Sequence, residues 1–192
     1  MNISFGKKIP IATGNIQNRK TGEFERATVY ELDCRDESDF QEVLLSRKDW
    51  NFNWEIYDNM QHKYNVLAHR IKMNPDFFYI LQTKDNETVA MAEISKWENN
   101  LFSIDWLDTK INNPYKFVGQ TFLACLAKES LANGGSAFAV LESMEDAIPF
   151  YTDVCKFTDC GKSGFHMDKE QMREFISRTE ERTQASIIDL KV

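Results

Sequence analysis

Two apolar segments separated by one helix restrict the possible folds of this chain more than any other feature. Residues 101–111, LFSIDWLDTKI, read as a central strand, and residues 136–143, SAFAVLES, read as a strand buried on both faces. Between them, Gly119–Asn133 has a helical pattern that Gly134 and Gly135 end. A strand, a helix and a second strand in this order form a right-handed crossover between parallel neighbours. The middle of the chain therefore predicts a parallel strand pair inside a sheet.

The flanking segments predict antiparallel strands and further helices. Period-two patterns and turn residues predict strands, and apolar spacings of three to four predict helices. The expected strands are 7–17, 23–33, 76–84, 88–98, 156–161 and 163–168, and the expected helices are 35–50, 53–71, 145–155 and 169–183. The fold class is therefore α/β, a single domain over residues 1–192 with a mixed sheet and helices on both faces.

Charge and composition argue against several classes of function. The net charge of −7 disfavours binding to nucleic acid, which requires clustered Lys and Arg. We expect no signal peptide and no membrane span, because the chain has no apolar stretch of suitable length. The four Cys and three His are scattered, so we expect free thiols and no metal site. These observations favour a cytoplasmic protein.

The segment INNPYKFVGQT, residues 111–121, has the features of an anion-binding loop. A helix N-terminus presents unpaired N–H groups, a glycine allows close approach, and Lys116 adds positive charge. A tight turn from strand to helix explains the same pattern and stays open as an alternative. The other phosphate motifs are absent: there is no GxGxxG after a strand, and CGKSG at 160–164 is preceded by Lys156 where a Walker A loop has glycine.

The wider pattern resembles the GNAT superfamily of acyl-CoA-dependent N-acyltransferases. In that family a strand ends in an aliphatic residue, and a loop of the form Q/R-x-x-G-x-G/A opens a helix. Here Ile111 precedes Gly119 by eight residues, and Lys116 and Thr121 replace two loop residues of the family. The family's next helix reads A-x-x-φ-Y-x-x-x-G-F, and here AIPFYTDVCKF, 147–157, matches it with one residue more. The resemblance covers about residues 27–168, so 1–26 is expected to be a hairpin extension and 169–192 a helix and tail.

The resemblance implies acetyl-CoA as cosubstrate, with no metal. The expected donor-binding residues are Ile111, Lys116, Phe117, Val118, Gly119, Gln120 and Thr121, with Phe150 and Tyr151 from the following helix. The backbone N–H groups from Phe117 to Thr121 would hold the pyrophosphate. The strands would separate at Ile111, where a free N–H polarises the thioester carbonyl.

Two further catalytic roles follow from the resemblance. Tyr151 matches the tyrosine that donates a proton to the leaving thiolate, a task suited to a phenol. Glu142 is the expected base for the amine, with Asp105, Asp108 and Glu93 as open alternatives. Cys125 is expected to pack in the core, because direct attack by the amine needs no covalent intermediate.

The expected activity is transfer of an acetyl group to a primary amine, on a small molecule or on a protein lysine or N-terminus. A catalytically inactive GNAT-like binding or regulatory module is the alternative. A toxin that acetylates aminoacyl-tRNA is disfavoured by the acidic charge. The aromatic residues Trp50, Phe52, Trp54 and Tyr57 could line the acceptor pocket or pack in the core. A homodimer is possible.

Overall fold

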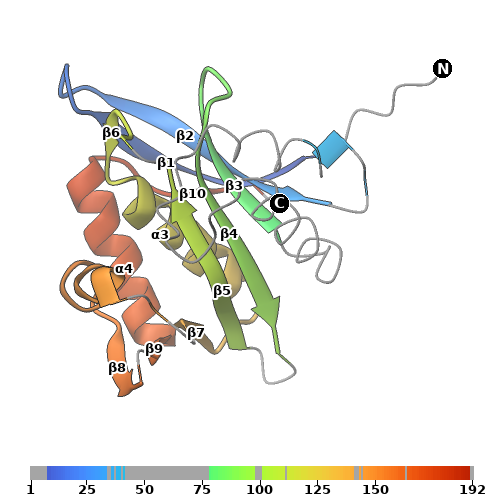
Figure 1. Cartoon of the computed structure of the whole chain (residues 1–192), viewed down its shortest axis with the longest axis vertical. Helices are drawn as coiled ribbons and strands as arrows, with labels where there is room; N and C mark the ends of the chain where they lie inside the picture. The colour runs from blue at the N-terminus through green and yellow to red at the C-terminus, as the bar shows by residue number, and fades with distance from the viewer. Residues whose placement is uncertain are drawn as a thin grey trace, which may run out of the picture.

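One mixed sheet runs through the molecule, as Figure 1 shows. The computed structural model describes residues 8–33, 36, 38–39, 41, 78–97, 101–110, 112–140, 143, 145–162 and 164–190. Within these residues the ten-stranded sheet has the order β10-β1-β2-β3-β4-β5-β7-β9-β8, and β6 also pairs with β1. The helices predicted at 35–50 and 53–71 lie almost wholly outside the described residues. The aromatic residues considered for the acceptor pocket, Trp50, Phe52, Trp54 and Tyr57, lie outside them too.

The elements have the following bounds. The strands are β1 Ile9–Asn18, β2 Phe24–Leu32, β3 Phe78–Thr83, β4 Thr88–Lys96, β5 Leu101–Thr109, β6 Tyr115–Lys116, β7 Ala137–Val140, β8 Thr158–Gly161, β9 Gly164–Asp168 and β10 Ile188–Asp189. The helical segments are α3 Val118–Ala132, the 3-10 turn η1 Glu145–Ala147, the π-helix η2 Phe150–Cys155 and α4 Lys169–Thr183.

The predicted crossover is confirmed. β5 and β7 pair in parallel, and α3 connects them across one face of the sheet. The other strand pairs of the described sheet are antiparallel. The predicted buried face of α3 is confirmed too, because Phe122, Leu123, Cys125 and Leu126 are all buried in the main core. This core lies between the sheet and the pair α3 and α4.

Helix α4 begins where its sequence indicates. Asp168 accepts hydrogen bonds from the N–H groups of Glu170 and Gln171, and the Gln171 side chain accepts one from the N–H of Asp168. This capping box satisfies three of the N–H groups at the start of the helix. Met172, Phe175 and Ile176 then face the core, as their spacing predicts.

Three features differ from the sequence prediction. The loop before α3 contains a short strand, β6, which pairs with β1. The tail after α4 forms β10 on the outer side of β1. Residues 145–155, predicted as one helix, contain the 3-10 turn η1 and the π-helix η2. β6 and β10 form because both pair with β1, and one residue more than the family pattern accompanies the π-helix.

No helix in the described part of the chain is long and apolar enough to cross a membrane.

Candidate functional site

The described pairing of the parallel strands β5 and β7 covers all of β7 and the first part of β5. Their described pairing runs from Leu101 and Ala137 to Ile104 and Val140, while β5 continues to Thr109. At this same point the register of β5 against β4 shifts, which places a bulge at Asp105. The residues that follow β7, 141 and 142, lie outside the described residues, and so does Ile111, where the strands are expected to separate.

The first turn of α3 presents backbone donors. Phe117, directly before the helix, is in the left-handed region with a φ of 64°. The N–H of Thr121 donates to the Phe117 carbonyl at 2.8 Å, whereas the N–H groups of Val118, Gly119 and Gln120 donate to no described residue. A left-handed residue followed by helical ones turns successive N–H groups toward one point, which suits an anion.

Gly119 joins this turn to η2 and to the end of β5. A Cβ added to Gly119 would lie 3.2 Å from Cζ of Phe150 and 3.7 Å from Cγ2 of Thr109. The space beside the glycine is therefore used by the Phe150 ring. The glycine allows this close approach of η2 to α3, since a Cβ here would push the Phe150 ring away by a few tenths of an ångström.

The remaining loop residues contribute in different ways. Lys116 is exposed, and its backbone pairs with Gln17 of β1. The Phe117 ring stacks on Phe24 of β2, with centroids 6.4 Å apart. The exposed ammonium group is the one cation that the predicted loop places at this turn.

Gln120 and Thr121 turn their side chains into the protein. Gln120 Nε2 donates to Oγ1 of Thr179 on α4 at 3.2 Å, and Thr121 Oγ1 donates to the carbonyl of Asn15 at 2.7 Å. Both residues are at most 4% exposed. Any contact they make with a ligand would therefore come from their backbone.

Tyr151 lies in an aromatic cluster at the end of β7. Its ring stacks on Phe165 at 5.7 Å and meets the edges of Phe150 and Phe157 at 5.3 and 5.6 Å. Phe165 is the partner of Val140 in the sheet, so the Tyr151 ring lies near the last described residue of β7. Burial raises the pKa of Tyr151 above its usual value, so the phenol keeps its proton at neutral pH.

The π-helix accounts for the residue that this segment has in excess of the family pattern. A π-turn contains one residue more per hydrogen-bonded loop than an α-turn, and such turns are frequent at functional sites. Lys156 then takes the left-handed conformation, with a φ of 65°, that a helix-ending glycine usually takes. Phe157 thereby returns to the core beside Tyr151.

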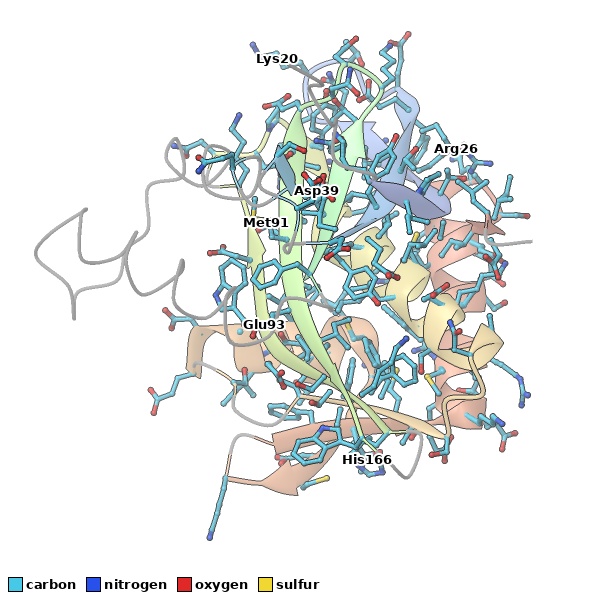
Figure 2. All side chains as sticks on the ribbon, turned by 90° about the vertical axis from the view of Figure 1, so that its right-hand side faces the viewer. Lys20, Arg26, Asp39, Met91, Glu93 and His166 are labelled. Carbon is cyan, nitrogen blue, oxygen red and sulfur yellow. The ribbon has the colours of Figure 1, made fainter. Side chains whose placement is uncertain are left out.

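The candidate bases divide into described and undescribed residues. Glu142, the expected base, lies outside the described residues. In the antiparallel pairing, Glu93 is opposite Trp106 and Met91 is opposite Asp108, so these four share the sheet face away from α3. Figure 2 shows Met91 and Glu93 on the side of β4 away from α3.

Asp105, at the bulge, is tied to neighbouring hydroxyls. It accepts a hydrogen bond from Ser103 Oγ at 2.9 Å and another from Ser95 Oγ. Glu93 is buried, with 1% of its surface exposed.

The described cysteine and histidine side chains lie in the core or on the β8–β9 hairpin. Cys125 is buried, which raises the pKa of its thiol to about 12 and agrees with a packing role. Cys160 Sγ lies 3.0 Å from Nδ1 of His166 on the exposed β8–β9 hairpin. The described residues contain no group of three His, Cys, Asp or Glu that could hold a metal.

Two residues near the site escaped the sequence analysis. Arg19 and Asn15 lie on the N-terminal hairpin, outside the segment that resembles the family, yet both contact α3 or the loop before it. Only the three-dimensional pairing of β1 with β6 brings them there, so no local pattern could have indicated them.

Comparison with known proteins identifies the fold. No family model matches the sequence, and no curated protein matches it. Among solved structures, a GNAT-family acetyltransferase from Brucella melitensis in complex with acetyl-CoA has a TM-score of 0.51, 11% identity and coverage of 74% of this chain and 88% of its own. PaiA N-acetyltransferase from Thermoplasma acidophilum in complex with coenzyme A has a TM-score of 0.50, 18% identity and coverage of 74% and 98%.

A third neighbour gives the same result. A GNAT-family acetyltransferase from Staphylococcus aureus Mu50 has a TM-score of 0.50, 12% identity and coverage of 74% of this chain and 98% of its own. At these identities the likeness concerns the fold. The chain has the GNAT fold, as its motifs indicated.

Proposed function

We propose that this GNAT-fold chain transfers an acetyl group from acetyl-CoA directly to a primary amine. One observation carries the proposal: the first turn of α3, whose N–H groups at Val118 to Gln120 donate to no described residue, packs against Phe150, next to the protonated phenol of Tyr151. An acetyl thioester with a phosphate-bearing tail matches these groups. The tail needs anion donors, and the thiolate needs a proton.

The proposed donor site is built from backbone more than from side chains. The N–H groups of Val118, Gly119 and Gln120 would bind the pyrophosphate, with the Lys116 ammonium as a second contribution. Phe150, packed against Gly119, would form the apolar wall along the pantetheine arm. The solved neighbours that hold CoA or acetyl-CoA support this choice of donor.

The proposed chemistry has two proton transfers. The amine nitrogen bonds to the thioester carbon, the bond from carbon to sulfur breaks, and the sulfur takes a proton from Tyr151 Oη. The amine loses one proton to a carboxylate, for which Glu142 is proposed. Glu93, Asp105 and Asp108 are the alternatives. Separate Glu142→Gln and Glu93→Gln variants test this assignment, since only the base should remove the acidic limb of the pH–rate profile.

The decisive experiment is calorimetry with CoA, followed by assay of free thiol release from acetyl-CoA with a panel of primary amines. We expect saturable CoA binding and amine-dependent thiol release above the spontaneous rate. Absence of binding at millimolar CoA would refute the proposal. Binding without turnover on any amine would instead support the inactive binding module.

A further inference from the structure

We infer that the N-terminal strand β1 with its turn, together with α4, belongs to the donor site and holds the phosphate-binding turn in position. Arg19 and Asn15 are the positioning residues. This inference rests on the proposed function. Neither segment lies in the part of the chain whose sequence resembles the family.

Arg19 ties the β1–β2 turn to the loop before α3. The backbone N–H of Arg19 donates to the Pro114 carbonyl at 2.8 Å. The side-chain Nε donates to the carbonyls of Asn113 and Tyr115, each at 3.1 Å. One arginine thus engages three consecutive carbonyls. These bonds fix the path of the chain directly before Phe117.

Asn15 ties the first turn of α3 to both β1 and α4. Its carbonyl accepts the Thr121 hydroxyl at 2.7 Å, and its Nδ2 donates to the Thr183 carbonyl at 3.2 Å. Gln120 adds the bond to Thr179 described above. Two successive residues of the turn are therefore held by segments far away in the sequence.

The stacking of Phe117 on Phe24 completes this support. A left-handed conformation is sterically unfavourable for a non-glycine residue, so surrounding contacts must maintain it at Phe117. The direction of the N–H groups of Val118, Gly119 and Gln120 depends on the conformation of Phe117. Displacements on the order of 1 Å in a positioned site can cost a large factor in binding or rate.

Arg26 provides a matched control for Arg19. It is also exposed and on the same hairpin, and its Nη1 also donates to a carbonyl, that of Ser186, at 3.0 Å. Its partner follows α4 and is not in the donor loop. Figure 2 shows Arg26 toward α4, away from Lys20 at the hairpin turn.

The test compares CoA with pantetheine, which has the same thiol arm without phosphates. Binding to the full chain is measured by calorimetry for wild type, Arg19→Ala, Arg19→Lys and Arg26→Ala, and thermal unfolding is measured for each. We expect Arg19→Ala to weaken CoA binding about tenfold, Arg19→Lys to recover part of it, and Arg26→Ala to leave it unchanged. Pantetheine should bind all four proteins alike.

A second variant guards against misfolding. Thr121→Val keeps the shape of the side chain but removes its bond to Asn15, so it should weaken CoA binding and spare pantetheine. Equal CoA affinity of Arg19→Ala and Arg26→Ala would overturn the inference, and so would an equal loss for CoA and pantetheine. If wild type bound no CoA, the proposed function itself would fail, which is a separate result.

Discussion

At the scale of single residues, Phe150 and Tyr151 are adjacent in sequence but serve different contacts. Phe150 fills the space beside Gly119, and Tyr151 stacks on Phe165. The position of the phenol therefore depends on a glycine on another element. The motif indicated that these residues belong together, whereas the contact between Gly119 and Phe150 required the structure.

Replacement of Tyr151 by Phe removes only the proposed acid. We expect kcat to fall about 10²-fold or more, the usual contribution of a positioned acid, with CoA affinity unchanged. Burial raises the pKa of Tyr151, so its protonated form persists through neutral and mildly alkaline pH. Loss of this acid should therefore not limit the wild-type rate below about pH 10.

A suitable control is Tyr79→Phe, which removes the hydroxyl of a buried tyrosine on β3. Its kcat should equal that of wild type. Equal kcat values for Tyr151→Phe and wild type would exclude the proton-donor role.

Lys156 is the residue where the π-helix ends in a left-handed conformation. Lys156→Gly should raise the free energy of unfolding by about 1 kcal/mol, because glycine adopts this conformation without the steric cost. Urea unfolding measures this change. Lys169→Gly, at the first position of α4, should be destabilising by contrast. A destabilised Lys156→Gly protein would mean that its backbone strain has been misjudged.

At the scale of elements, β1 and α3 are in very close contact at Gly14. A Cβ on Gly14 would lie 2.6 Å from Cγ2 of Thr121, closer than real Cβ contacts allow. Gly14→Ala should therefore lower the free energy of unfolding by about 1–3 kcal/mol, as expected for overpacking. Thr121→Ser removes Cγ2 and retains the hydroxyl, so it should restore most of the loss in the double variant.

Urea unfolding of the two single variants and the double variant forms a complete cycle. Strict additivity of the two substitutions would show that this contact does not control the packing of β1 on α3.

Sequence reasoning succeeded for elements whose own pattern determines them. β5, α3 and β7 have apolar patterns characteristic of their type, and α4 has a capping box at Asp168. It failed for β6 and β10, which are two residues long and exist because β1 offers partners. It also missed the π-helix, because the extra residue was read as a departure from the motif and not as a change of helix type.

The candidate site divides in the same way. Gly119 and Tyr151 are predicted from motifs, each of which lies within one segment of the sequence. Arg19 and Asn15 contribute through contacts made across nearly the whole sequence, and no pattern within one segment encodes those.

At the scale of the whole molecule, buried groups that resist ionisation predict sensitivity to alkali. Burial raises the pKa of Tyr115 and Cys125 to about 12 each, and raises that of Tyr79, Tyr151 and Cys155 as well. Above about pH 9–10 the unfolded chain therefore binds fewer protons than the folded one. The free energy of unfolding must then fall as pH rises.

Urea unfolding at a series of pH values from about 8 to about 11 tests this prediction. The buried tyrosines should ionise together with unfolding, as measured by phenolate absorbance. Free, pH-dependent ionisation of all tyrosines in the folded protein, with constant stability, would contradict it.

The bond from Asn15 to Thr183 joins residues 168 positions apart and has a consequence for synthesis. A ribosome completes β1 early, but the helix that carries Thr183 emerges only after almost all the rest of this chain. Contacts of such long range also form slowly, because the intervening loop must first close. The nascent polypeptide therefore cannot complete the proposed donor site until α4 has left the exit tunnel, so binding at that site would come after translation of this segment.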